Sequence, residues 1–262
     1  MKTPALTIIL FVAAVLLSAP HAMAENQIPF DEEVVDEYND FDDFDEFTSP
    51  ESGSTKPVFD PLRGYNRLIF NFNDKMYFWV LKPVGTGYSK AVPEPARLSI
   101  RRFFHNIKFP VRFVNNILQF KIAGSGRELT RFVTNSTLGI GGFFDPARAW
   151  WGLEPSEEDF GQTLGFYGVG DGFPIMLPFM GNSNLRDLAS MFPDYYLDPF
   201  KYLETNDKVF VDPVYVGMGT LQIINDTSLR LGMYENIKKH ALDPYTFVRD
   251  AYKQNRDKKI RE

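Results

Sequence analysis

The side chains that catalysis or metal binding would need are scarce in this sequence. It has no cysteine, and of its three histidines only His105 and His240 lie beyond residue 24. Neither histidine sits in a known motif, and the chain has no nucleophile elbow, zinc-protease motif or phosphate-binding loop. Acidic groups at 157–159 and the pair Asp194 and Asp198 are of a kind more often solvated than catalytic. We therefore expect no catalytic residue, no metal site, no cofactor and no enzyme.

The composition indicates a protein with much exposed apolar surface and does not indicate a catalytic site. Apolar residues make up 44% of the 262, and they include 25 Phe, 12 Tyr and 3 Trp, more than a core of this size readily buries. The net charge of −6 combines two unlike parts. Residues 25–55 hold twelve acidic residues and no Lys or Arg, whereas from Lys56 onward 27 basic residues face 22 acidic ones. The sequence thus predicts a basic body behind an acidic segment.

The N-terminus has the pattern of a secretory signal. An apolar run from Ala5 to Ala19 is followed by Ala22-Met23-Ala24, a small-x-small cleavage site. No later window is apolar enough to span a bilayer. We expect a signal peptide at 1–24, an acidic disordered segment at 25–59, a helical domain at 60–256 and a short charged tail at 257–262. The acidic segment is interpreted as a solvated linker, with a docking segment or a shield for the basic body as alternatives.

Repeated helix-start signals predict an all-α body. Asp-Pro occurs at 60–61, 145–146, 198–199, 212–213 and 243–244. Asp caps the free amides of a first turn, and Pro at the first helical position has no amide to satisfy. Some of these pairs are equally compatible with turns. Helices are expected from Pro61 to about Val80, from about Pro95 to Lys108, from Pro110 to about Ile122 and from about Gly126 to Thr137.

These helices are strongly amphipathic. On the first, an apolar stripe of about 120° contrasts with a mostly polar remainder, but Phe70, Tyr77 and Phe78 project outside the stripe, so this helix is apolar on more than one side. On the third, an apolar half-circumference stands opposite Arg112, Asn115, Asn116 and Gln119. Such faces suit either the core of a helical domain or a bilayer interface. Core packing is the better reading for any single helix, but export and the aromatic surplus favour the interface for the set.

The middle of the chain is rich in glycine. Residues 161–172 contain five glycines, so we expect no regular helix there. Residues 174–181 are apolar, broken by two prolines and too short to span a bilayer. The glycines permit close backbone approach or hinge motion, and a tight structural loop is an equally good interpretation.

Many short motifs in unbroken order resemble the MlaA (VacJ) family over residues 60–256. They include Asp60-Pro61-Leu62-Arg63-Gly64-Tyr65-Asn66-Arg67, Asn71-Phe72-Asn73, Asn115-Asn116-Ile117-Leu118-Gln119, Gly141-Gly142-Phe143, Phe160-Gly161-Gln162-Thr163-Leu164-Gly165 and Tyr167-Gly168-Val169-Gly170. The resemblance implies an all-α, ring-like assembly of amphipathic helices lying in the inner leaflet of the outer membrane around a central amphipathic channel. It also implies removal of misplaced phospholipids from the outer leaflet, which maintains lipid asymmetry.

The same resemblance implies partners and candidate site residues. The partners are phospholipid, a porin trimer of the outer membrane and a soluble, MlaC-like periplasmic lipid carrier, with no nucleic acid. The apolar stripe of the first helix fits this picture, and we assign Leu62, Leu68, Ile69, Phe72 and Met76 to membrane or lipid contact, with the core side as the alternative. The channel or a hinge is assigned to Gly161, Gly165, Gly168, Gly170, Gly172, Phe173, Met176 and Leu177.

The chain departs from the family pattern in having no lipobox cysteine. We therefore expect an exported protein at the periplasmic side of the outer membrane that is not acylated. Two other functions remain open at this point. One is an exported enzyme acting on lipids, which would need His105 or His240, and the other is a scaffold that only organises porins.

Overall fold

The computed structural model describes residues 58–203 and 213–262. The expected signal peptide and acidic segment, up to residue 57, lie outside the described residues. The structure below is that of the compact unit Thr55–Glu262.

The unit is built almost entirely of helices, as predicted. In chain order its elements are α3 (Arg63–Met76), the π-helix η3 (Tyr77–Leu81), α4 (Lys82–Ala91), α5 (Glu94–Ile107), α6 (Phe109–Leu118), α7 (Ile122–Thr137), α8 (Pro146–Trp151), α9 (Phe160–Phe166), β1 (Pro174–Leu177), β2 (Gly181–Asn184), α10 (Leu185–Leu197), the 3-10 helix η4 (Pro199–Leu203), α11 (Pro213–Leu229), α12 (Met233–His240) and α13 (Pro244–Arg261). No helix in the described part of the chain has the length and hydropathy to cross a bilayer.

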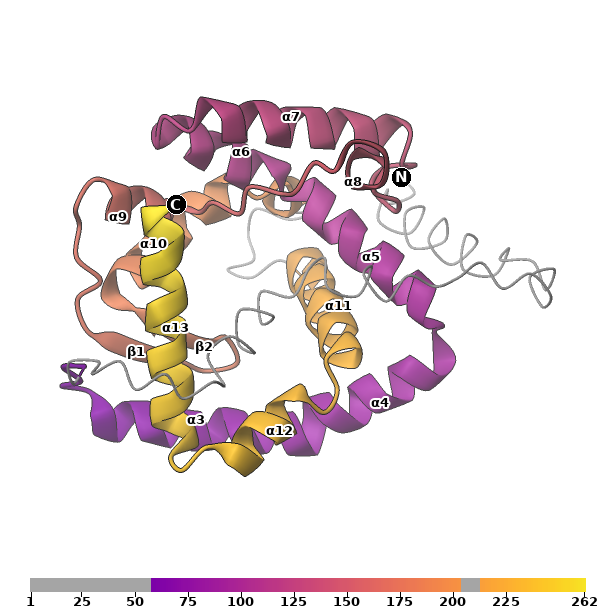
Figure 1. The fold of residues 1–262 in the computed structure, drawn as a ribbon. Helices are drawn as coiled ribbons and strands as arrows, with labels where there is room; N and C mark the ends of the chain where they lie inside the picture. Colours follow the sequence, from indigo (N-terminus) through magenta and orange to yellow (C-terminus); the bar gives the residue numbers. More distant parts are fainter. Residues whose placement is uncertain (1–57, 204–212) are drawn as a thin grey trace. The chain divides into compact units, whose positions relative to one another are not determined.

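The contacts between elements close on themselves. Helices α3, η3 and α4 form one continuous run, and its last part, α4, packs against α11. Helix α11 also packs against α5, which leads into α6. Helix α6 packs against α9, and α9 against α10 and α13. Both α10 and α13 reach β2, which pairs with β1, and β1 packs against α3. Figure 1 shows this ring-like circuit, which the fold class predicted.

A small antiparallel hairpin is the one departure from an all-helical unit among the described residues. Its strands pair from Pro174 opposite Asn184 to Leu177 opposite Gly181. Gly181 has a φ of +85°, a left-handed conformation that glycine adopts without strain. The prolines at 174 and 178 bracket a segment too short for a helix, and its backbone groups pair with β2 instead.

The first helical run continues through a proline. Pro83 has no amide and its ring would collide with the carbonyl of Trp79 in a regular α-helix. The π-helical turn Tyr77–Leu81 lies just before it and widens the helix at this point. Residues 63–91 are therefore helical throughout, longer than the helix to Val80 that we predicted.

The Asp-Pro pairs have different outcomes. The Asp145 carboxylate accepts from Arg148 N and caps α8, and Asp198 accepts from Phe200 N at the start of η4. Asp243 precedes α13 but makes no cap hydrogen bond to its backbone. Asp60 does not cap α3, which begins at Arg63 with Leu62 as its N-cap. Asp212 lies outside the described residues, and α11 begins at Pro213.

Two boundaries correct the sequence interpretation. Helix α9 spans Phe160–Phe166 although no helix was expected over 161–172, because Asp159 caps its first turn by accepting from Gln162 N at 2.8 Å. Helix α13 runs to Arg261, so the residues expected to form a charged tail belong to the helix. Helix ends are set by such caps and by tertiary contacts as much as by propensity.

The apolar core is small. Ile100 and Phe104 of α5 meet Phe200 of η4, and partly buried residues of α5 and α11 surround them. For α5, core packing is therefore the correct one of the two readings of its apolar face. Elsewhere the interior is polar: among the described residues, 24 buried side chains are polar or charged and nine are apolar.

Candidate functional site

The polarity of α6 is reversed relative to a soluble helical protein. Arg112, Asn115 and Asn116 are buried, whereas Ile117 and Leu118 are exposed. Each Asn side chain donates to the carbonyl four residues earlier at 2.9 Å and to a second, distant acceptor. The amphipathic face predicted from the sequence is correct, but its polar side faces inward.

Helix α7 repeats the same arrangement. Its inner face carries Glu128, which accepts from Arg112 Nε at 2.7 Å, and Arg131, which is paired with Asp145. Its outer face carries Leu129 and Val133, both about half exposed. Buried charges are tolerated only when paired and hydrogen-bonded, which these are. Two adjacent helices therefore hold ion pairs inside and present aliphatic side chains outside.

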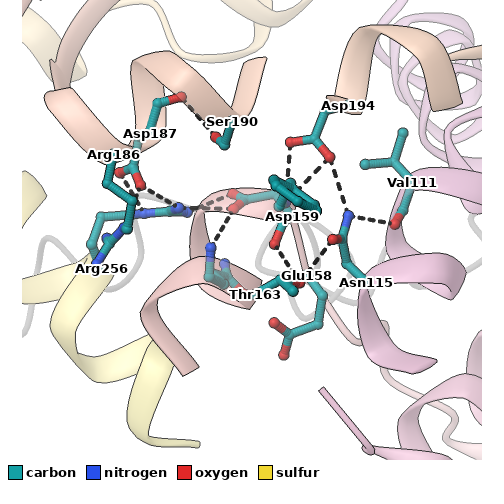
Figure 2. Close-up of polar contacts among 12 residues, drawn as sticks. Val111, Asn115, Glu158, Asp159, Thr163, Arg186, Asp187, Ser190, Asp194 and Arg256 are labelled. Atoms are coloured by element: carbon teal, nitrogen blue, oxygen red, sulfur yellow. Dashed lines mark hydrogen bonds and ion pairs between the residues drawn. The ribbon is translucent and has the colours of Figure 1, made fainter. Parts of the chain in front are cut away.

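A cluster of ion pairs joins α9, α10 and α13 (Figure 2). Arg256 of α13 binds Asp159 through both terminal nitrogens, at 2.5 and 2.8 Å. The same guanidinium reaches Asp187 of α10 at 3.0 and 3.1 Å. Asp187 also accepts from Tyr252 OH at 2.7 Å and from Arg186 Nε at 3.0 Å. The cluster ties the C-terminal helix to two elements in the middle of the chain.

Electrostatics favour the charged forms in this cluster. Burial opposes the charge of Arg256, but hydrogen bonds and attraction from Asp159 and Asp187 outweigh it and raise the pKa of the guanidinium. Burial likewise opposes the charge of Asp159, but Arg256 lowers the pKa of that carboxyl below its usual value. The expectation that residues 157–159 form a solvated acidic face is therefore wrong, since their carboxylates are paired within the unit.

The neighbouring acids are held by amides and a lysine. Glu158 is buried and accepts from Gln119 Nε2 at 2.7 Å and from Lys121 Nζ at 2.6 Å. Asp194 accepts from the backbone amide of Phe160 and from Asn115, as Figure 2 shows. Burial and the nearby charge of Asp159 raise the pKa of Asp194 to about 6. Asp194 is thus the member of this group whose charge changes near neutral pH.

The polar side of α3 holds the hairpin. Asn66 is fully buried, donates to Pro174 O at 2.9 Å and accepts from Met176 N at 2.8 Å. Asn73, two turns later, does the same with Leu177 O and Phe179 N, both at 2.9 Å. An asparagine side chain offers the same donor and acceptor as a peptide group, so the two residues extend the hairpin's hydrogen bonding.

The residues assigned to membrane or lipid contact form an apolar stripe about a quarter of a turn around α3 from Asn66 and Asn73. Leu68 is 64% exposed, and Leu62 and Phe72 are also exposed. Ile69 and Met76 are partly buried. The apolar stripe of this helix is thus largely directed away from the interior, where Asn66 and Asn73 lie.

The glycines assigned to the channel or a hinge fall into two groups. A Cβ on Gly161 would lie 2.4 Å from Asp187 Oδ1 and 2.6 Å from Arg256 Nη2, and one on Gly165 would lie 2.6 Å from Ile260 Cδ1. These two glycines permit close packing of α9 against α10 and α13. Gly168 and Gly170 are exposed with open space where a side chain would be, in the connection between α9 and β1.

The last members of the assigned set lie at or near the hairpin. Gly172, with a φ of +73°, packs closely against Leu185, so it needs both its conformation and its lack of a side chain. Phe173 and Leu177 are partly buried, and Met176 is buried. Met176 also lines a small cavity between α3, the hairpin and α13, which Arg249 and Lys253 border.

The two histidines have structural partners. His105 Nε2 lies 2.5 Å from Glu157 Oε1, and His240 Nδ1 lies 2.8 Å from Asn236 O. Burial and the charge of Arg112 lower the pKa of His105 despite the opposing effect of Glu157. Within the described ranges, no group of three or more His, Asp or Glu residues is arranged to hold a metal ion.

The sequence alone did not predict that the polar residues of several helices are buried together and form one connected group. A usable signal was present in Arg112, Asn115, Asn116 and Gln119, which follow helical spacing and form one face. Four side chains with hydrogen-bonding groups on one face, three of them amides, differ from the Lys and Glu of a solvated surface. Their partners on α7 and α9 could not be read from the same helix.

Comparisons with known proteins agree with one another. The family model described as MlaA lipoprotein matches residues 58–259. An uncharacterized protein of Rickettsia bellii (strain RML369-C) is 33% identical over 225 residues, covering 86% of each chain. The intermembrane phospholipid transport system lipoprotein MlaA of Escherichia coli (strain K12) is 36% identical over 201 residues, covering 76% of this chain and 77% of the relative.

A solved structure is also similar. It comes from work on the structural basis for maintenance of bacterial outer membrane lipid asymmetry, and it aligns with a TM-score of 0.67 at 34% identity. The alignment covers 77% of this chain and 99% of the other. The unit therefore shares its fold with that structure.

The packing of Gly161 gives a first prediction. Gly161→Ala places a methyl group against Asp187 and Arg256 and is expected to lower the free energy of unfolding by about 1 to 3 kcal/mol. Gly170→Ala, in open space, is the matched control and should change it by less than about 0.5 kcal/mol. Thermal unfolding of both variants measures the difference, and equal effects would contradict the packing role.

Asp194 gives a second prediction, on pH dependence. Between its unfolded pKa near 3.8 and its folded pKa of about 6, the folded state keeps a proton that the unfolded chain releases. Its contribution to stability therefore falls as pH rises through this window. In Asp194→Asn, the fall in the free energy of unfolding across this window should be smaller by about 1 to 2 kcal/mol, a figure that allows for the partial exposure of Asp194. Unfolding curves at pH 4 and pH 7 test it, and parallel pH profiles would exclude the assignment.

Proposed function

The chain belongs to the MlaA family, and from this premise we propose that it transports phospholipid between membranes and maintains the lipid asymmetry of the outer membrane. In detail, it takes phospholipids misplaced in the outer leaflet through a channel and passes them to a soluble, MlaC-like periplasmic carrier. No bond is made or broken in this transfer. The protein acts at the periplasmic side of the outer membrane, in its inner leaflet.

The reversed polarity of the unit carries the proposal. Its exposed large apolar side chains number 33 among the described residues, while the Arg112–Glu128, Arg131–Asp145 and Arg256–Asp187 pairs and the amides beside them are buried. A phospholipid has a charged headgroup that must avoid hydrocarbon and acyl chains that must stay in it. A ring of helices with polar side chains inside and apolar ones outside meets both requirements.

The outer stripe of α3 supplies part of the membrane contact. Leu62, Leu68, Ile69, Phe72 and Met76 are the residues proposed for it. Moving an apolar side chain of this size from water into hydrocarbon is worth roughly 1.5 to 3 kcal/mol before ordering costs. A few such residues therefore hold the unit in a leaflet.

The channel is proposed to lie beside the connection between α9 and the hairpin. Gly168, Gly170 and Gly172 give this connection conformational freedom, and Phe173, Met176 and Leu177 follow it into β1. Gly161 and Gly165 contribute by letting α9 pack closely against its neighbours. The side chains of Asn66 and Asn73 fix the hairpin that borders this region.

The partners proposed from the family are a porin trimer and the periplasmic carrier. A porin gives access to the outer leaflet from within the membrane, and a carrier shields acyl chains in water. A protein that only organised porins would have no use for a polar interior. Transport is therefore favoured over a scaffold.

Lipid flux tests the function directly. Labelled phospholipid is loaded into vesicles that contain the protein and its co-purified outer-membrane partners, and transfer to the soluble carrier is followed over time. Transport predicts a flux that depends on the protein. A flux equal to that of vesicles without the protein would contradict the proposal and leave the scaffold.

The membrane face of α3 gives a further prediction. Phe72→Asp places a charge on a side chain that is 39% exposed on the apolar stripe, and membrane retention should fall about tenfold or more. Asn71→Asp adds the same charge one position earlier, off that stripe, and serves as the control. Membrane fractionation and surface phospholipid levels are measured for both. Normal values for Phe72→Asp would show that this face does not contact lipid.

A further inference from the structure

Three turns hold a bulky apolar residue in the left-handed region. Phe120, Ile140 and Phe179 have φ values of +57°, +53° and +66°. This conformation is normally taken by glycine or asparagine, and for a β-branched residue such as Ile140 it is a clear outlier. Strain of this kind persists only where the surrounding structure enforces it, and it is concentrated at functional sites.

None of the three side chains is used by the interior. Phe120 is 72% exposed, Ile140 65% and Phe179 64%. Burial within the unit therefore compensates little of the strain, although Phe120 and Phe179 each meet one other exposed ring. The benefit of a large apolar group at these positions has to come from something outside the unit.

The backbone at these turns is fixed by hydrogen bonds. At the end of α6, Phe120 N donates to Ile117 O and Lys121 N to Asn116 O, both at 2.9 Å. This is the position after a helix where glycine is usual. Directly after Ile140, the amides of Gly141 and Gly142 donate to backbone carbonyl groups in the last turn of α7. These bonds fix the turn that follows this helix. The bulky residues thus occupy rigid turns and point outward as fixed pegs.

Helix α7 connects two of these pegs with an apolar face. Phe120 precedes it, Ile140 follows it, and Leu129 and Val133 lie exposed between them. The hydroxyls on this face are satisfied by the helix itself: Thr130 donates to Gly126 O at 2.8 Å and Thr137 to Val133 O at 2.7 Å. The centre of this face therefore offers no free hydroxyl, and the exposed Arg127 lies at its edge, where a long side chain can reach the headgroup region.

The shortage of free hydrogen-bonding groups on the outer face of α7 favours the hydrocarbon of a bilayer, and not another protein, as the partner of this face. A protein interface of ordinary size carries about one hydrogen bond per 100 to 200 Å² and a polar rim. A surface in hydrocarbon has to satisfy its polar groups internally, as these threonines do.

The pegs also adjoin other exposed aromatic rings. Phe120 lies 6.5 Å from Phe166, and Phe179 lies 5.2 Å from Phe72, between ring centroids. The hairpin tip and the end of α6 thereby extend the apolar surfaces of α3 and α9. Exposed aromatic groups of this size contribute strongly to transfer into a bilayer.

We propose that Phe120, Ile140 and Phe179 are membrane pegs that insert into the acyl-chain region of the bilayer, with the outer face of α7 lying flat between the first two. The inference rests on the membrane location in the proposed function. It adds that the strained turns, and not only the helix stripes, set the depth of the protein in the leaflet.

Site-specific labels test the insertion. Because the sequence has no cysteine, Phe120→Cys, Ile140→Cys and Phe179→Cys each carry one polarity-sensitive fluorophore. Leu242→Cys is the matched control, since Leu242 is fully exposed in the connection before α13 and has no left-handed φ. On adding vesicles of phosphatidylethanolamine and phosphatidylglycerol, we expect a blue shift of about 20 nm or more at the three pegs and none at 242.

The outcomes separate this inference from the proposed function. If the protein floats with the vesicles but the three labels stay at their aqueous wavelength, the pegs are excluded while the membrane location stands. If no vesicle binding occurs, both are contradicted. A shift produced only by an added outer-membrane barrel would identify a protein occupant and overturn the lipid assignment.

Asparagine variants give a second readout. Asn adopts the left-handed conformation readily, so the triple variant Phe120→Asn, Ile140→Asn, Phe179→Asn should keep the helical circular dichroism of the wild type. Its bound fraction in vesicle flotation should fall at least tenfold, and that of Leu242→Asn should not change. Unchanged flotation of the triple variant would refute the pegs.

Discussion

The arrangement of the unit depends on the ion-pair cluster around Arg256. This residue lies near the end of the chain, yet it binds Asp159 at the start of α9 and Asp187 in the first turn of α10. Without it Asp159 would lose its ion pair and Asp187 would be left with Arg186 as its cation, and breaking a buried pair costs several kcal/mol. The cluster also requires that α9 come close, which Gly161 permits. One guanidinium thus fixes the C-terminal helix against the middle of the chain and completes the circuit of contacts.

The same logic applies on the other side of the circuit. Arg112 with Glu128 and Arg131 with Asp145 join α6, α7 and the start of α8. Near Phe104 and Phe200 apolar packing plays the larger role. A fold held mainly by paired charges can leave its apolar side chains outside, where the proposed membrane would receive them.

Much of the secondary structure could be predicted from the sequence. The expected bounds of α5, α6 and α7 are right to within about four residues, because prolines and sharp changes in periodicity mark them. The direction of each face could not be predicted. Periodicity defines two faces of a helix, and the solvent decides which is inside. For α5 the apolar face packs inward, and for α6 and α7 it does not.

The candidate site was less accessible to sequence reasoning. Asn66 and Pro174 are 108 residues apart, and Arg256 and Asp159 are 97 apart. Such pairs follow from tertiary topology and leave no local pattern. The acidic run ending at Asp159 resembles a solvated surface until its partners are known. Helix α9 was missed for the same reason, since its cap and its packing outweigh the low helix propensity of its glycines.

The reversed polarity has a thermodynamic consequence. The heat-capacity increment of unfolding arises mainly from apolar groups that water reaches only after the native structure is lost. Here many of those groups already stand at the outer surface of the native unit. Its stability curve should therefore be flatter, and its denaturant dependence shallower, than those of a water-soluble helical protein of equal length. Loss of the folded state would instead respond strongly to pH, which acts on the paired charges in its interior, and only weakly to ionic strength, because salt screens buried pairs little.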